Sequence, residues 1–219
     1  MDSYLTKKIN QYDKWMNSGG ITSASKVIPV SESLDATEWV MPSEQALEVL
    51  ADAGSFAVTA CECRTRYGNC DHPREVCFLL GATADKYVEK GRGRRVSLDE
   101  AKEILKQADA SGLVHLTLFK PDQETFALCS CCACCCHDFQ IIKQLGRHEI
   151  MARSDFRAVT DQAACVHCGV CTQRCPFQAR RLETDENGET TLMVDDGACL
   201  GCGLCVTPCP TGAVAMERR

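Results

Sequence analysis

Long apolar stretches are missing from this chain of 219 residues. A helix that spans a bilayer needs about 20 consecutive, mostly apolar residues, and the longest apolar runs here are far shorter. The first residues include Asp2, Lys7 and Lys8, and no apolar segment of the signal-peptide type follows them. We therefore expect a cytoplasmic protein with no membrane span.

Motifs for organic cofactors and haem are also missing. No Gly-x-Gly-x-x-Gly pattern follows a predicted strand, and Gly91-x-Gly93 alone is too short to indicate a dinucleotide site. The haem-attachment pattern Cys-x-x-Cys-His does not occur. We therefore expect no flavin, NAD or haem.

Positive charge is in deficit as well. The sequence has 24 Lys and Arg against 30 Asp and Glu, which gives a formal net charge of −6. Proteins that bind nucleic acid carry a positive footprint that attracts phosphates. We therefore expect no nucleic-acid partner.

Cysteine, in contrast, is abundant, with 18 residues. A disulfide requires particular distances and directions between its Cα atoms, and vicinal pairs such as Cys131 and Cys132 satisfy them poorly. Disulfide-rich proteins are also typically secreted, and we expect this one to stay in the cytoplasm. We therefore interpret the cysteines as metal ligands in a reducing compartment.

Eight cysteines form two copies of the motif Cys-x2-Cys-x2-Cys-x3-Cys-Pro, which cover residues 165–176 and 199–210. Two-cluster bacterial ferredoxins bind a pair of [4Fe–4S] clusters with this spacing. Three thiolates of one motif reach irons of one cluster, and the fourth points toward the other cluster. The spacing therefore predicts two crossed ligand sets: Cys165, Cys168, Cys171 and Cys209 for cluster 1, and Cys199, Cys202, Cys205 and Cys175 for cluster 2.

A zinc ribbon is the alternative interpretation of these motifs, because it also uses Cys-x2-Cys pairs. A ribbon needs four ligands in two pairs. This chain instead has two complete quartets, each of which ends in Cys-Pro. The pattern therefore favours iron–sulfur clusters over zinc.

The remaining ten cysteines are candidate ligands for one or two further clusters, and they are Cys61, Cys63, Cys70, Cys77, Cys129, Cys131, Cys132, Cys134, Cys135 and Cys136. Soft thiolates suit additional iron–sulfur cubanes, a zinc–thiolate cluster or a non-cubane cluster with bridging thiolates. We rank iron–sulfur first, because the chain already carries that chemistry. Vicinal cysteines in extended backbone point to opposite faces, so the pairs Cys131/Cys132 and Cys134/Cys135 are each expected to serve two different clusters.

Hydrophobic spacing predicts several elements along the chain. Residues 4–17 carry Leu5, Ile9, Tyr12 and Met16 on one helical face. This helix is expected to pack on its own domain, and docking to a partner is the alternative. Further helices are expected after Pro42, over residues 75–89 and after Ser97, and a β-hairpin over 180–194 with its turn at 187–188.

We divide the chain into three parts. Residues 1–40 are an N-terminal helix and an extended arm, residues 41–150 a Cys-rich cluster-binding domain, and residues 151–219 a two-cluster domain. The expected fold class is α+β, with a mainly helical Cys-rich domain followed by a small β-α-α-β repeat domain.

Residues 156–219 resemble the two-[4Fe–4S] bacterial ferredoxins through both complete Cys-Pro motifs. That resemblance implies one-electron transfer at low potential. Residues 42–150 resemble the N-terminal region of uncharacterised ferredoxin-like proteins of anaerobes. The shared features are Cys61-x-Cys63-Arg64, His72-Pro73 with Cys77, Leu113-Val114-His115 and the Cys-rich run.

Together these observations predict an iron–sulfur electron-transfer subunit that serves a larger redox enzyme or oxidoreductase complex in anaerobic metabolism. Such a protein is a subunit rather than a stand-alone enzyme. One alternative is a reductase subunit whose Cys-rich domain holds a catalytic cluster that acts on a disulfide or another small substrate. A second alternative is a redox or metal sensor.

Overall fold

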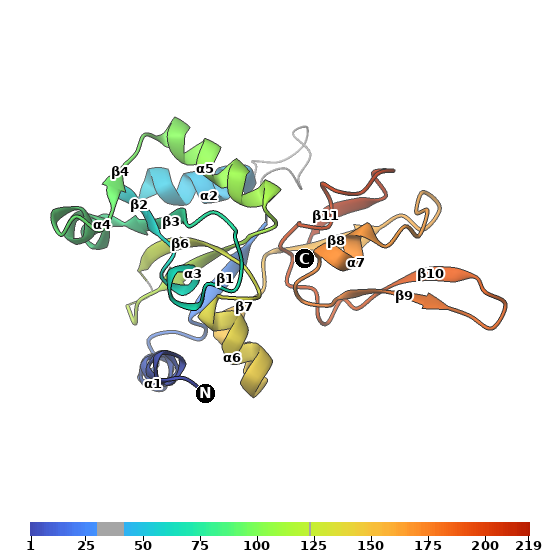
Figure 1. Cartoon of the computed structure of the whole chain (residues 1–219), viewed down its shortest axis with the longest axis horizontal. Helices are drawn as coiled ribbons and strands as arrows, with labels where there is room; N and C mark the ends of the chain where they lie inside the picture. The colour runs from blue at the N-terminus through green and yellow to red at the C-terminus, as the bar shows by residue number, and fades with distance from the viewer. Residues whose placement is uncertain (30–41, 123) are drawn as a thin grey trace.

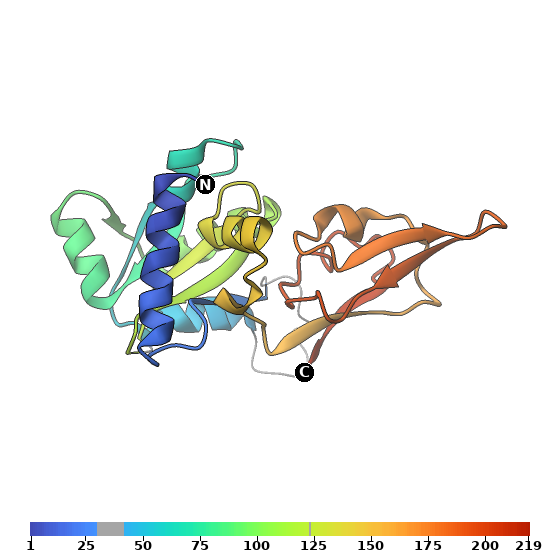
Figure 2. The ribbon, with the colours of Figure 1, turned by 90° about the horizontal axis from the view of Figure 1, so that it is seen from below.

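The computed structural model describes residues 1–29, 42–122 and 124–219. Residues 30–41, which belong mainly to the predicted extended arm, lie outside the described residues. A large sheet with its helices occupies residues 1–152, and a smaller C-terminal module, residues 154–219, lies beside it (Figures 1 and 2).

The large sheet has seven strands in the order β4-β2-β3-β6-β5-β1-β7. All neighbouring strands are antiparallel except β1 and β7, which pair in parallel. β1 lies in the segment that was predicted to be an extended arm. β7 lies just beyond residue 150, the predicted end of the Cys-rich domain. The strands are β1 (Ser25–Ile28), β2 (Phe56–Ala60), β3 (Glu75–Leu80), β4 (Arg94–Arg95), β5 (Val114–Phe119), β6 (Thr125–Cys131) and β7 (Met151–Ala152).

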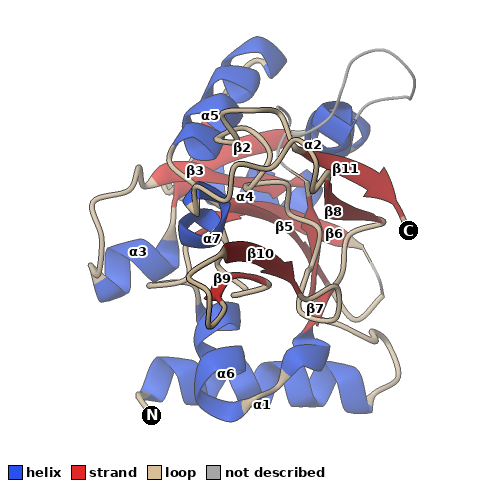
Figure 3. Ribbon diagram, turned by 90° about the vertical axis from the view of Figure 1, so that its right-hand side faces the viewer, coloured by secondary structure: helices blue, strands red, loops and turns tan. Residues whose placement is uncertain are grey.

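Helices cover both faces of this sheet, as the view along it shows (Figure 3). On one face lie α2 (Pro42–Asp52) and α5 (Leu98–Ala110), and on the other lie α1 (Ser3–Asn17) and α6 (His137–Leu145). Each face of the sheet has its own hydrophobic core, because successive side chains of a strand point to opposite faces. In β1, Val27 packs toward α1 whereas Ile28 packs toward α2. Shorter helices are α3 (Glu62–Tyr67), α4 (Gly81–Glu89) and the 3-10 turn η2 (His148–Ile150).

The expectation of a mainly helical Cys-rich domain is wrong, because a seven-stranded sheet is the centre of this part of the chain. The clearest difference lies at residues 75–89, which were expected to form one helix. Residues 75–80 form β3 between β2 and β6, and α4 begins only at Gly81, whose φ is +52°. A short continuous apolar run fits a buried strand or a buried helix equally well, so tertiary pairing decides between them.

The C-terminal module is built from two antiparallel strand pairs around its cysteine loops. β8 (Phe156–Thr160) pairs with β11 (Val214–Arg218), and β9 (Arg180–Thr184) pairs with β10 (Thr190–Val194). The second pair confirms the predicted hairpin over residues 180–194. Of the two helices expected in a β-α-α-β repeat, the described residues form α7 (Val170–Arg174) within the first motif and only hydrogen-bonded turns at the matching place in the second.

Candidate metal centres

The first pocket of the C-terminal module is lined by four cysteines. They are Cys165, Cys168, Cys171 and Cys209. The loop of the first motif is tied to the hairpin, because the backbone N–H of Leu192 donates to Nδ1 of His167 at 3.0 Å. His167 has a φ of 49°, so this contact holds a backbone turn that few non-glycine residues adopt.

The second pocket is lined by Cys175, Cys199, Cys202 and Cys205. Burial raises the pKa of the Cys202 thiol, and it raises that of Cys205 to about 11. Gly201 is required in this loop, since its φ is +76° and a Cβ atom would lie 1.9 Å from the carbonyl oxygen of Phe156.

Each pocket therefore presents four thiols, and these are the four expected from the motif spacing. Four Cys thiolates are the usual donor set of a [4Fe–4S] cluster, so the residues present fit this group. The assignment of individual cysteines to individual irons stays a prediction.

Six of the other ten cysteines form a closed ring of neighbouring thiols, which we call the six-thiol ring. The side chains interact in the order Cys61, Cys63, Cys136, Cys131, Cys129, Cys77 and back to Cys61. They come from the start of α3, from β3, from β6 and from the residue before α6. The fold thus brings together residues that are up to 75 positions apart in the sequence.

The direction of the pKa shift alternates around the six-thiol ring. The contact with Cys63 lowers the pKa of Cys61, and contacts with Cys131 lower the pKa of Cys129 and of Cys136. Contacts with Cys136 and Cys61 raise the pKa of Cys63, and contacts with Cys129 raise the pKa of Cys77 and of Cys131. Six neighbouring sulfur donors of this kind suit soft metal ions.

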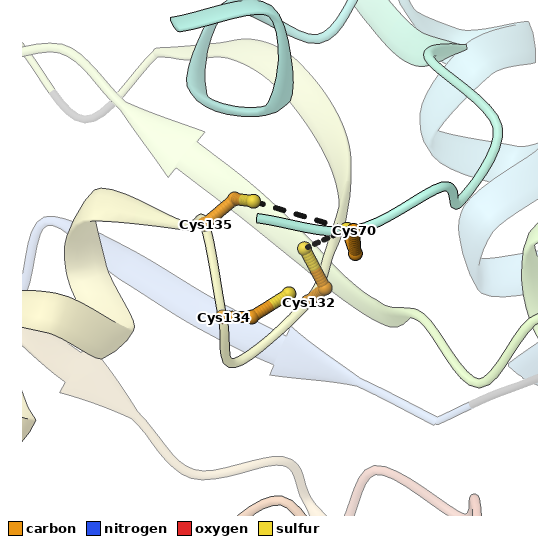
Figure 4. Close-up of side chains that lie close together, drawn as sticks. All are labelled: Cys70, Cys132, Cys134 and Cys135. Atoms are coloured by element: carbon orange, nitrogen blue, oxygen red, sulfur yellow. Dashed lines mark hydrogen bonds between the residues drawn. The ribbon is translucent and has the colours of Figure 1, made fainter. Parts of the chain in front are cut away.

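The other four cysteines converge at a separate place, which we call the four-thiol site. The Sγ atoms of Cys70, Cys132, Cys134 and Cys135 all lie within 4.8 Å of one another (Figure 4). Cys131 and Cys132 thus face different centres, as expected for extended backbone. Cys134 and Cys135 share one centre, because residues 133–135 form a turn in which strand alternation does not apply.

A buried guanidinium lies between the two thiol groups. Arg64 is 1% exposed, and both its Nη atoms donate to the carbonyl oxygen of Ser130 at 3.0 Å. Its Nη1 also donates to Sγ of Cys132 at 3.7 Å. Burial acts to lower the pKa of Arg64, but the Cys61 and Cys132 thiolates outweigh it and raise that pKa above its ordinary value.

A hydrogen-bonded network from α1 reaches the six-thiol ring. Nδ1 of His137 lies 3.0 Å from Sγ of Cys63, and Nε2 lies 2.6 Å from the hydroxyl of Tyr12. Tyr12 also donates to Oδ1 of Asp138 at 2.9 Å. The helical spacing of α1 identified Tyr12 only as a core residue, and a hydroxyl on an otherwise apolar face was the signal for its second role.

His115 forms a buried Asp-His-Ser arrangement that is structural. Its Nε2 lies 2.5 Å from Asp109, and its Nδ1 lies 3.1 Å from the hydroxyl of Ser130. The side chains of His115 and Ser130 are fully buried, so no substrate reaches the hydroxyl. The arrangement instead supports β5 and β6 beneath the cysteines, as expected for a histidine outside the metal motifs.

The second pocket shares a hydrophobic core with the six-thiol ring. Cys202 and Leu204 pack in the same buried cluster as Cys131 and Cys136. The rings of Phe139 and Phe177 stack across this contact with centroids 5.3 Å apart, and Phe177 also lines the second pocket. The two parts of the chain are therefore joined at the second pocket.

A groove of about 700 Å³ runs beside this contact. Its lining includes Lys143, His148, Arg153 and Phe177. Among the described residues, no cysteine is part of its lining. This groove therefore gives no direct access to the thiols.

Comparison with known proteins identifies a 4Fe-4S dicluster domain over residues 164–213. A ferredoxin from Pyrobaculum islandicum is 51% identical over 37 residues, which are 17% of this chain and 33% of that relative. The chain thus covers about a third of the length of this relative. These findings support a 4Fe-4S-binding, ferredoxin-type segment that contains both C-terminal pockets.

In the part of the chain that the structure describes, no helix has the length and apolar character needed to cross a membrane.

Proposed function

We propose that this chain is an electron-transfer subunit that carries electrons between a ferredoxin-type module and the Cys-rich centres, and on to or from a larger redox enzyme in anaerobic metabolism. The dicluster match and the many clustered thiols support iron–sulfur electron transfer. Clusters bound in the two pockets would supply one-electron redox chemistry at low potential.

The shared core is the observation that carries the proposal. Cys202 and Cys136 belong to one buried hydrophobic cluster, so a continuous core extends from the second pocket to the six-thiol ring. Phe139 and Phe177 hold this contact by stacking. Dry, closely packed surroundings are what electron transfer between two centres within one protein requires.

A reductase is the second candidate, since the groove has a volume that is typical of small-molecule sites. A substrate in that groove would meet Lys143, Arg153 and Phe177, but none of the thiols that hold the centres. A catalytic cluster needs an exchangeable position that its substrate can reach. The geometry therefore favours transfer over reduction of a small substrate.

The test is to mix oxidised, anaerobically prepared protein rapidly with less reductant than its centres can accept. We expect the N-terminal and C-terminal centres to reach redox equilibrium with each other, with electrons then passing to artificial acceptors. A centre at the six-thiol ring that stays oxidised while C-terminal clusters of lower reduction potential are reduced would contradict the proposal. A paramagnetic signal that appears only with an added disulfide, followed by turnover, would favour the reductase.

A further inference from the structure

The four-thiol site differs from every other cysteine group in the protein by its compactness. Sγ of Cys70 lies 3.7 Å from that of Cys132 and 3.8 Å from that of Cys135. All four sulfurs are within 4.8 Å of one another, and they point toward a common centre (Figure 4). Over the described ranges, no other three ligand atoms of His, Cys, Asp or Glu lie this close together.

These distances match a single metal ion and not a cluster. Zinc–sulfur bonds of about 2.3 Å in a tetrahedron place the sulfurs about 3.8 Å apart. The thiolates of a [4Fe–4S] cluster stand farther apart, because the iron–sulfide core lies between them. The two C-terminal quartets provide an internal comparison, since each surrounds a pocket and neither is as compact as the four-thiol site.

Hydrogen bonds connect the two segments that carry the four-thiol site. The backbone N–H of Asn69 donates to Sγ of Cys135. The side chain of Asn69 also donates to the carbonyl oxygen of Cys134 at 2.9 Å. These bonds join the loop after α3 to the turn at residues 132–136.

A buried cation faces the negative charge that four thiolates would bring to the site. Four thiolates around a divalent ion leave a net charge of about −2, which is costly in a half-buried position unless cations or hydrogen-bond donors face it. Nη1 of Arg64 faces Cys132 from the buried side. Arg64 therefore offsets part of this charge from the buried side, and four thiolates complete a tetrahedral donor set.

We propose that Cys70, Cys132, Cys134 and Cys135 bind one thiophilic metal ion in closed tetrahedral coordination, either Zn²⁺ or iron. The ion cross-links the loop after α3 to the turn before α6. Cys63 of α3 and Cys136, the residue before α6, belong to the six-thiol ring, so the two centres share these parts of the fold. The ten N-terminal cysteines then divide into a one-ion site of four thiols and a larger centre of six. The single-ion site is a claim separate from the proposed electron transfer, and it holds whether or not the chain transfers electrons.

The experiment is to measure zinc, iron and acid-labile sulfide per chain in anaerobically prepared full-length protein and in three variants. Cys70→Ser should lose one metal ion and no sulfide. Cys61→Ser, the matched variant in the six-thiol ring, should lose several irons together with sulfide. Cys134→His should keep the single ion, since three Cys and one His form a common zinc site.

Zinc analysis and the high-spin ferric signal of a mononuclear thiolate site distinguish the two ions. Loss of one zinc, or of that ferric signal, in Cys70→Ser supports the proposal. Loss of about four irons and four sulfides in Cys70→Ser would overturn it, because the four thiols would then hold a cluster. Retention of the ion in Cys134→His shows that the site tolerates substitution, so misfolding of Cys70→Ser cannot imitate the expected result. Failure of electron transfer in the rapid-mixing test would leave this metal count unchanged.

Discussion

At the scale of single residues, polar groups determine how the buried thiols are charged. His137 and Arg64 are two buried side chains whose nitrogen atoms contact the sulfurs of N-terminal cysteines. Groups that hydrogen-bond to metal ligands orient those ligands and tune the metal. Two substitutions test this role.

Tyr12→Phe removes one hydroxyl that contacts both His137 and Asp138. Because this network is buried, the loss of the hydroxyl should lower the free energy of unfolding by about 1–3 kcal/mol. It should also shift the reduction potential of the centre at the six-thiol ring, since His137 contacts Cys63. Redox titration followed by paramagnetic resonance measures the shift. Tyr87→Phe on α4, which removes a hydroxyl far from the cysteines, should leave the potential unchanged.

Arg64→Gln removes a buried positive charge from between the thiol groups. Reduction adds negative charge, so without the guanidinium the reduction potential of the nearby centre should become more negative. Arg64→Lys keeps the charge but loses the two parallel donors to Ser130. We therefore expect Arg64→Lys to weaken stability without the full change in potential. Equal shifts in the two variants would show that the charge is not the cause.

At the scale of elements, two contacts hold the molecule together. The N-terminal helix packs on the large sheet, and the corner between α5 and β5, residues 109–113, contacts the C-terminal module. Tyr4, Leu5 and Tyr12 of α1 are buried against the protein's own core. The exposed face of α1 is therefore the one that remains for a partner, and docking through residues 4–17 stays a prediction. At the corner, Nη2 of Arg174 donates to the carbonyl oxygen of Asp109 at 3.1 Å.

Gly112→Ala tests the contact at this corner. Gly112 has a φ of +74°, and an added Cβ would lie 2.9 Å from Nη1 of Arg174. We expect the methyl group to displace Arg174 and to slow electron exchange between the C-terminal and N-terminal centres in the rapid-mixing experiment. Gly68→Ala is the matched control, because its φ is +60° with no atom within 4 Å of the added Cβ. In both variants, alanine in this left-handed conformation lowers the free energy of unfolding by about 1 kcal/mol. The difference between the two variants therefore measures the contact with Arg174.

The sequence predicted some of these elements well and others poorly, for identifiable reasons. The α1 helix and the β9–β10 hairpin are local patterns, and both formed as expected. The large sheet depends on pairings between distant strands such as β3 and β6, which no local period reveals. Likewise, motif spacing predicted the cysteines of the two C-terminal pockets. The division of the other ten thiols required the turn at residues 133–135 and the convergence of α3, β3 and β6.

At the scale of the whole molecule, the metal count tests the complete assignment. The two C-terminal pockets should contribute about eight irons and eight sulfides per chain. The six-thiol ring should raise both counts, and the four-thiol site should add one ion without sulfide. Anaerobically prepared protein with only eight irons and eight sulfides plus zinc would exclude an iron–sulfur centre at the six-thiol ring.

Acid should release iron from the second pocket in a predictable direction. Burial raises the pKa of Cys205 to about 11, so its thiol is protonated at neutral pH whenever no metal is bound. Protons and metal therefore compete for the same sulfur, and metal affinity should rise with pH up to that pKa. We expect cluster uptake at pH 8 to release protons, and cluster loss to accelerate as the pH falls toward 6. An uptake that is independent of pH in this range would contradict the raised pKa.

The order of the thiols along the chain also constrains how the protein is made. Cys61 emerges from the ribosome long before its ring partner Cys136, and Cys70 long before Cys135. At a synthesis rate of about 5–20 residues per second, the earlier thiols wait roughly 4–15 seconds for their partners. Cofactor delivery to this part of the chain is therefore an event that follows translation of residue 136. In the interval, the unprotected thiols are open to oxidants and to any free metal ion, so a cell that makes this protein must control both.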